Sequence, residues 1–172
     1  MAATAQWFED NGAATGTPAK GTTRAAAPNC DWKSVDDIAT SRKNATIIAG
    51  QNSYHKYQFV KFTGTYNSIS AGKFAHTTGS VGTGLTIVDK VTSTYATPAR
   101  TALADSTDIT TITPINNGQA VKFATTGPEG TASNSLTAEG YSQYIVTQLQ
   151  TQATAAAGDI GEQELTFQWN EN

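Results

Sequence analysis

The sequence predicts an all-β fold, an antiparallel β-sandwich of the jelly-roll kind with an extended N-terminal arm. About eight or nine short segments rich in β-branched and aromatic residues recur at spacings of roughly ten residues. Turn residues separate these segments, and none has the length and period of an ordinary helix. We therefore expect an arm over residues 1–27 and a β-sandwich domain over residues 28–172 of this 172-residue chain.

The segment 1–27 is dominated by Ala, Thr and Gly, and only Trp7 and Phe8 offer substantial apolar surface. Such a segment cannot by itself offset the entropy lost on folding. We expect an extended arm, mobile or laid across a neighbouring surface, with Trp7 and Phe8 as its anchor. The domain should then fold without residues 1–27. In the alternative, Trp7 and Phe8 add a first strand to the domain's own sheet.

Residues 29–39 carry Trp32, Val35 and Ile38 at a spacing of three. This spacing suits a helical turn or an irregular strand with a bulge, and the sequence does not decide between them.

Strand candidates follow at residues 45–49 and 54–62, around a turn-like stretch. In the second candidate, aromatic or aliphatic residues fall at both odd and even positions, and so on both faces of a strand. Either both of its faces are covered or a bulge near Phe59 switches them. Residues 65–76 are expected to form another strand, with a kink at Gly72.

The glycine-rich segment 79–84 lacks the Walker and dinucleotide patterns and precedes a strand candidate at 85–91, so it is predicted to be a loop between strands. Short strands are expected again at 109–115 and 119–124. The Asn-Asn-Gly sequence at 116–118 predicts a hairpin between them.

The segments 141–151 and 162–170 are predicted to form a terminal hairpin that closes the domain. The second alternates apolar and polar side chains, which indicates one face toward a core and one toward water. The apolar row is Leu165, Phe167 and Trp169. The polar row, where we expect a neighbouring subunit to bind, is Glu164, Thr166, Gln168 and Asn170.

Charge and cysteine content argue against several functions. Charged residues make up 15% of the chain and the net charge is −3, whereas roughly a quarter of residues are charged in typical domains. Lysines and arginines are scattered, so neither nucleic acid nor a membrane surface is an expected partner. The single cysteine, Cys30, excludes an internal disulfide and is expected to be a small, half-buried side chain. No signal-peptide pattern occurs, so we expect use in the cytoplasm of the producing cell or release by lysis.

Residues suited to catalysis are few. His55 and His76 are the only histidines, and either could in principle form a catalytic triad with Asp89 or Asp105 and a hydroxyl. No spacing supports it, because the chain lacks a nucleophile-elbow motif and a nucleophile beside a base. We expect neither an enzyme nor a cofactor.

Metal and sugar sites have weak sequence support. Asp105 and Asp108 could hold a calcium ion, but a plain turn accounts for them better. Tyr54, Tyr66 and Tyr95 could stack on a glycan, although aromatic residues in strands more often belong to a core.

Six segments together resemble structural proteins of tailed bacteriophages. They are residues 29–36, 52–57, 62–69, 94–98, 141–149 and 166–171. The resemblance extends over most of the chain and consists of strand and turn patterns, with no catalytic residue to carry over. Two departures are modest: His55 stands where an acidic residue is expected, and Trp169-Asn170 where Tyr-Asp is usual.

The resemblance implies a virion component, most specifically a β-sandwich decoration or cement protein that bridges capsomers on the capsid exterior. Its partners would be the major capsid protein and copies of itself, after assembly in the cytoplasm of the bacterial host. A tail, baseplate or fibre protein and a host-surface glycan-binding module are the alternatives. The low charge and Thr-rich composition suit a protein held in many copies by weak contacts.

Overall fold

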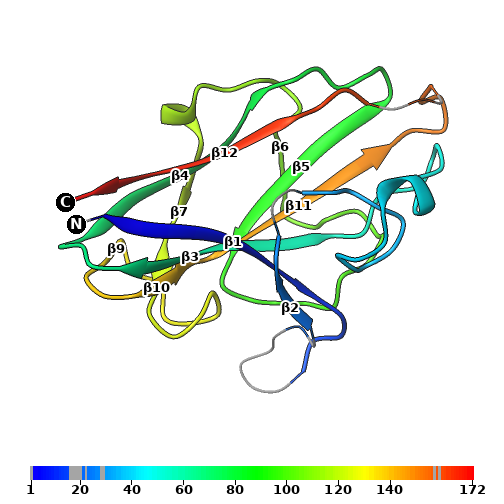
Figure 1. The fold of residues 1–172 in the computed structure, drawn as a ribbon. Coiled ribbons are helices and arrows are strands. Elements are labelled where there is room, and N and C mark those ends of the chain that lie inside the picture. The colour runs from blue at the N-terminus through cyan, green and yellow to red at the C-terminus, as the bar shows by residue number, and fades with distance from the viewer. Residues whose placement is uncertain (1, 16–20, 22, 28–29, 157, 159) are drawn as a thin grey trace.

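The computed structural model describes residues 1–172 except 1, 16–20, 22, 28–29, 157 and 159. The regular secondary structure of the described chain is almost entirely β, arranged in two antiparallel sheets that are joined by long loops (Figure 1). Apolar side chains from one sheet pack against those of the other. The predicted all-β sandwich is therefore confirmed, whereas the strand order does not show the jelly-roll topology.

The larger sheet has eight strands, in the order β2-β1-β3-β11-β5-β6, with β10 beside β3 and β8 beside β10. Its long strands are β1 (Ala3–Asn11), β3 (Lys56–Gly64), β5 (Leu85–Thr92) and β11 (Tyr144–Thr151). Its short strands are β2 (Thr23–Ala26), β6 (Thr107–Asp108), β8 (Phe123–Ala124) and β10 (Gly140–Ser142).

The smaller sheet has four strands, in the order β12-β4-β7, with β9 also paired to β4. These strands are β4 (Ile69–Thr78), β7 (Gln119–Val121), β9 (Ser135–Leu136) and β12 (Glu164–Glu171). The helical content of the described chain is two single turns, η1 (Arg42–Asn44) and η2 (Ile115–Asn117). No helix in the described residues is long and apolar enough to span a bilayer.

The expectation of an N-terminal arm is wrong for residues 3–11. They form β1, which pairs with β3 from Ala3 opposite Gly64 to Asp10 opposite Tyr57, and with β2 on its other side. The alternative, a first strand of the domain's own sheet, is what the structure has. Composition misled because β1 does not fold alone: its backbone bonds to two neighbouring strands, and its few apolar side chains pack against a core that the rest of the domain supplies. Residues 16–20 and 22 of the predicted arm lie outside the described residues.

The predicted terminal hairpin is also wrong, although both strands form. β11 lies in the larger sheet beside β3 and β5, whereas β12 lies in the smaller sheet beside β4 (Figure 1). The connector over residues 152–163 is long enough to pass from one sheet to the other. Only a tight turn forces consecutive strands to pair, and this connector is not one.

Four other predicted elements differ from the structure. Residues 45–49 form no strand, and the described part of segment 29–39, residues 30–39, contains bends rather than a helical turn or a strand. The hairpin predicted around 116–118 is absent, because η2 occupies this turn and β7 pairs with β4. The short strand predicted over residues 109–115 is absent too: these residues run between the sheets, with backbone hydrogen bonds from Ile109 to β5 and from Thr113 to β4.

The core lies on both faces of β3. Tyr57 and Phe59 join a cluster on one face, while Val60 and Phe62 join a cluster toward the smaller sheet. All four side chains are buried, so both faces of the strand are covered, which is one of the two alternatives that the sequence left open. Loops rather than a third sheet cover the first face, for example through the buried Tyr95.

Candidate functional site

Trp7 and Phe8 are part of the protein's own core. Successive residues of a strand point to opposite faces, and the two aromatic rings accordingly lie on different sides of the larger sheet. The Trp7 and Phe167 rings form a T-shaped pair at a centroid distance of 6.1 Å, and Phe8 stacks on Phe59 at 5.7 Å. The structure therefore does not bring them together as an exposed anchor.

The alternation predicted for residues 164–170 is present in β12. Glu164, Gln168 and Asn170 are exposed, whereas the apolar row is half-buried against the core. Thr166 is half-buried because its hydroxyl lies 2.5 Å from that of Thr77 in β4. The polar row thus covers the outer face of the smaller sheet along its last strand.

β12 is a continuous strand of eight residues with one open edge. Among the described strands it pairs with β4 alone. Its pairing register shifts twice, and in both places the extra residues belong to β4, at Thr77 and at Ala71-Gly72. Ala71 adopts a φ of 54°, a left-handed conformation suited to a bulge. At the second shift Trp169 of β12 also has no register partner, but the extra residue in each place belongs to β4, and β12 runs without interruption from Glu164 to Glu171.

The other strands at or near sheet edges are short. β2 has four residues, β7 has three, and β6 and β9 have two each. β12 has eight, contains neither lysine nor proline, and carries its charges only at its two ends. Monomeric proteins usually protect edges by shortness, lysine, proline or bulges. β12 uses none of these devices, which makes it the strand best suited to pair with another chain.

A second candidate site is a buried polar cluster where β1 ends and β3 begins. Glu9 and Lys56 are each 1% exposed, and Asn11 is 4% exposed. The Lys56 ammonium donates to Glu9 Oε1 at 2.9 Å, and the Asn11 amide donates to the same oxygen at 2.8 Å. Gln58 donates to the second oxygen, Oε2, at 3.0 Å. One carboxylate thus organises three side chains from two adjacent strands.

The segment after residue 29 covers this cluster. The Trp32 indole donates to the Thr147 hydroxyl at 3.1 Å, and the Cys30 sulfur lies 3.0 Å from the same oxygen. Thr147 is the register partner of Lys56. Burial raises the pKa of the Cys30 thiol to about 12. The side chains of this irregular segment therefore cover this end of the larger sheet, whereas the smaller sheet covers the rest of the same face.

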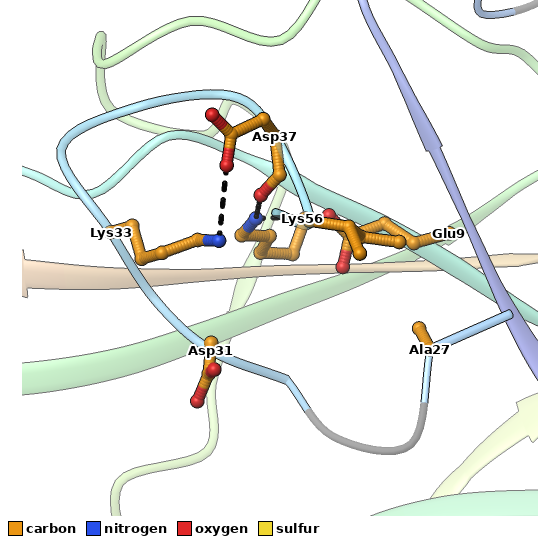
Figure 2. Close-up of a pocket in the computed structure, with 7 residues that line it drawn as sticks. Glu9, Ala27, Asp31, Lys33, Asp37 and Lys56 are labelled. Carbon is orange, nitrogen blue, oxygen red and sulfur yellow. Dashed lines mark hydrogen bonds and ion pairs between the residues drawn. The ribbon is translucent and has the colours of Figure 1, made fainter. Parts of the chain in front are cut away.

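A cavity of about 220 Å³ adjoins the cluster (Figure 2). Its lining residues are Glu9, Ala27, Asp31, Lys33, Asp37, Ile38 and Lys56. The buried Lys33 ammonium donates to the Thr40 carbonyl at 2.7 Å and to the Asp37 carboxylate at 3.3 Å. Hydrogen bonds from the Thr40 hydroxyl and backbone, together with Lys33, lower the pKa of Asp37. Figure 2 shows both lysine side chains reaching toward Asp37.

The opposite face of β1 carries a third group of charges. Asp10 accepts two hydrogen bonds from the Arg24 guanidinium, at 2.7 and 2.6 Å, and another from the Tyr144 hydroxyl. Glu129 also lies against Tyr144, at 2.7 Å. Burial, followed by these two carboxylates, raises the pKa of Tyr144. Arg24 additionally lies over the Phe59 ring, which ties β2 to the core.

The histidines are not assembled with the aspartates suggested for a triad. His55 Nε2 lies 2.9 Å from the Thr101 carbonyl, and burial lowers its pKa. Both ring nitrogens of His76 lie against backbone carbonyls. Asp89 accepts a hydrogen bond from Gln119, and Asp105 faces Lys90 at 3.3 Å.

The residues suggested for calcium or sugar have other partners. The Asp105 carboxylate pairs with Lys90, and Asp108 accepts a hydrogen bond from the Thr110 backbone. Over the part of the chain that the structure describes, no group of three or more His, Cys, Asp or Glu side chains could hold a metal ion. Tyr95 is buried and donates to the Gly12 carbonyl at 2.7 Å. Tyr54 and Tyr66 are half-buried.

The polar cluster was not predicted from the sequence, although the sequence holds one usable signal. Glu9 has the same strand parity as the core residue Trp7, and Lys56 has the same parity as Val60. Charged residues on an apolar face are rarely buried unless they are paired. Two of them of opposite sign on strand candidates would have indicated a buried pair.

Comparison with known proteins finds no relative: no protein-family model, curated protein or solved structure matches the chain.

Proposed function

We propose that this chain is a structural component of a tailed-bacteriophage virion, and more narrowly a decoration (cement) protein that binds the capsid exterior and bridges or stabilises capsomers. The six segments that resemble such proteins support this proposal, as does the antiparallel β-sandwich. Under the proposal, the partners are the major capsid protein and other copies of this chain.

The observation that carries the proposal is the open edge of β12. It combines eight consecutive strand residues, a polar outward row and no protective lysine or proline. A strand of this kind can add to a neighbouring sheet through main-chain hydrogen bonds, while its side chains select the partner. In a monomer such an edge is a liability, whereas in a repeated assembly it is a ready contact.

Low charge suits the same role. With 15% charged residues, few strongly hydrated side chains have to lose water when the surface is covered. Each contact can then be weak, because many copies on one particle hold the assembly together by avidity.

Electron cryomicroscopy of purified phage particles that contain the protein tests its location. We expect density for the sandwich on the outside of the head, with β12 against a capsid subunit or another copy. Density confined to the tail or baseplate would overturn the decoration role and support the alternative structural role.

An add-back assay tests the contribution of β12. Particles stripped of the protein are mixed with purified chain carrying Gln168→Lys, which places a charge in the exposed row. We expect apparent affinity to fall at least about tenfold, or ~1.4 kcal/mol. The matched control is Gln152→Lys, another exposed glutamine that lies outside both sheets. Equal occupancy by both variants would show that β12 is not the contact.

A further inference from the structure

The buried polar cluster holds the three groups needed to form an amide bond between two side chains. These are an amine, a carboxamide and a carboxylate that contacts both. Lys56 and Asn11 provide the first two, and Glu9 Oε1 accepts hydrogen bonds from Lys56 Nζ at 2.9 Å and from Asn11 Nδ2 at 2.8 Å. We propose that this chain joins Lys56 to Asn11 by an intramolecular isopeptide bond, with Glu9 as the group that transfers the protons.

The backbone positions of the two reacting residues suit this bond. β1 and β3 are antiparallel, and Asp10 opposite Tyr57 is their last register pair in this direction. Asn11 and Lys56 are the next residues on the two strands. Side chains of facing residues start about 5 Å apart at their Cβ atoms. Holding two reactants in this way replaces a bimolecular encounter by a unimolecular step.

Burial makes the lysine suitable as a nucleophile. An ammonium ion cannot attack a carbonyl carbon, and lysine nucleophiles in proteins are activated by desolvation or by a neighbouring base. Lys56 and Glu9 are each 1% exposed and directly hydrogen-bonded. Passing a proton from Nζ to Oε1 removes both charges from the interior, where isolated charges are costly.

The reaction balances without an oxidant or a cofactor. Glu9 takes a proton from the Lys56 ammonium, and the free amine attacks Cγ of Asn11. The Cγ–Nδ2 bond then breaks, the Nζ–Cγ bond remains, and a second proton leaves Nζ. Glu9 relays both protons to Nδ2, which departs as an ammonium ion, and Glu9 returns to its ionised form.

Two neighbouring features favour departure of the nitrogen. Asn11 Nδ2 also donates to Asp36 Oδ1 at 2.8 Å, so the leaving nitrogen lies between two carboxylates that would stabilise it as ammonium. The cavity of about 220 Å³ is lined by Glu9 and Lys56 themselves. It provides space beside the reacting groups for the small product.

Asp36 also suppresses the main competing reaction. Asn11 precedes Gly12, and the backbone nitrogen of such a glycine can attack Cγ to form a succinimide with the same loss of ammonia. Here the Gly12 N–H donates to Asp36 Oδ2 at 2.7 Å, which holds that nitrogen away from attack. The cluster therefore directs Asn11 toward Lys56.

Mass spectrometry of the full-length chain purified from bacteria tests the proposal. We expect the intact mass to be lower than the sequence mass by one ammonia, and proteolysis to release one peptide pair joined through Asn11 and Lys56. Glu9→Gln keeps the shape of the side chain but removes the base, so it should have its full sequence mass. Asn11→Asp should still form the bond, with loss of one water instead of ammonia.

Two results would overturn the proposal. One is a folded wild-type chain with its full sequence mass after prolonged incubation near neutral pH. The other is loss of ammonia without a linked peptide pair, which identifies a succinimide. The wild-type measurement decides by itself if a variant fails to fold. Far-UV circular dichroism and cooperative thermal unfolding establish folding in each sample.

Discussion

Asp89 gives the structure a specific dependence of stability on pH. Its residue is 0% exposed in β5, on the face toward the smaller sheet. One carboxyl oxygen accepts a hydrogen bond from Gln119 of β7, and in the described part of the chain the other has no hydrogen-bond partner. Burial raises the pKa of this carboxyl group from 3.8 to about 7.

The direction of the effect follows from proton binding. Between about pH 4 and pH 7 the folded state binds a proton at Asp89 that the unfolded state has released. The free energy of unfolding therefore falls as pH rises through this window and becomes level above pH 7. A pKa difference of roughly three units corresponds to a loss of ~4 kcal/mol.

The variant Asp89→Asn removes this loss, because the amide stays neutral and its oxygen can still accept from Gln119. Near pH 4 we expect the variant and the wild type to have similar free energies of unfolding. Near pH 8 the variant should be more stable by up to ~4 kcal/mol. Urea denaturation of both proteins at several pH values measures the difference.

Asp108→Asn is the matched control for this experiment, since Asp108 is exposed and its carboxylate accepts a backbone hydrogen bond that an amide oxygen can also accept. The control should follow the wild-type pH curve. The reasoning is refuted if the stability difference between Asp89→Asn and wild type is the same at pH 4 and pH 8, or if the variant is the less stable protein at pH 8.

Two further predictions concern the N-terminal strands and the thiol. Deletion of residues 1–27 removes β1, β2 and the half-buried Trp7 and Phe8. Truncating these two side chains alone costs several kcal/mol, out of a total free energy of unfolding of about 5–15 kcal/mol for a typical domain. The shortened chain should lose cooperative thermal unfolding by circular dichroism, and a sharp transition near that of wild type would contradict this. Cys30 has a pKa of about 12 in the folded chain, so little of it is thiolate near pH 8. It should react with a thiol-specific disulfide reagent at least about a hundredfold more slowly in the folded chain than in the urea-unfolded chain. Equal rates would show that the thiol is accessible and ordinarily acidic.

Strand β12 illustrates what could be predicted from the sequence. The alternation in residues 164–170 is local, so the sequence correctly predicted a strand with a polar outward row and an apolar inward row. It did not predict the partner strand. Pairing with β4 depends on a connector that changes sheets and on two bulges in β4, neither of which leaves a trace in the alternation itself.

The buried polar cluster illustrates what could not be predicted from the sequence. Glu9 and Lys56 are 47 residues apart in the chain, and only the register between β1 and β3 brings them together. Residues 1–27 were expected to form an arm, with a first strand of the sheet as the alternative, and neither expectation fixes a register with β3 from which a contact between the two charges could be inferred. The Asp36 carboxylate, which completes the cluster, lies in a segment without regular structure.

The sequence by itself determined the fold class and the two-faced character of β12, because both depend on side-chain order within individual strands. It left open whether both faces of β3 are buried, which the structure decided. The tertiary structure alone decided that residues 3–11 belong to the sheet, that the last two strands lie in different sheets, and that Glu9, Asn11 and Lys56 meet. These features arise from strand order and register, which are set by the packing of distant segments and not by local pattern.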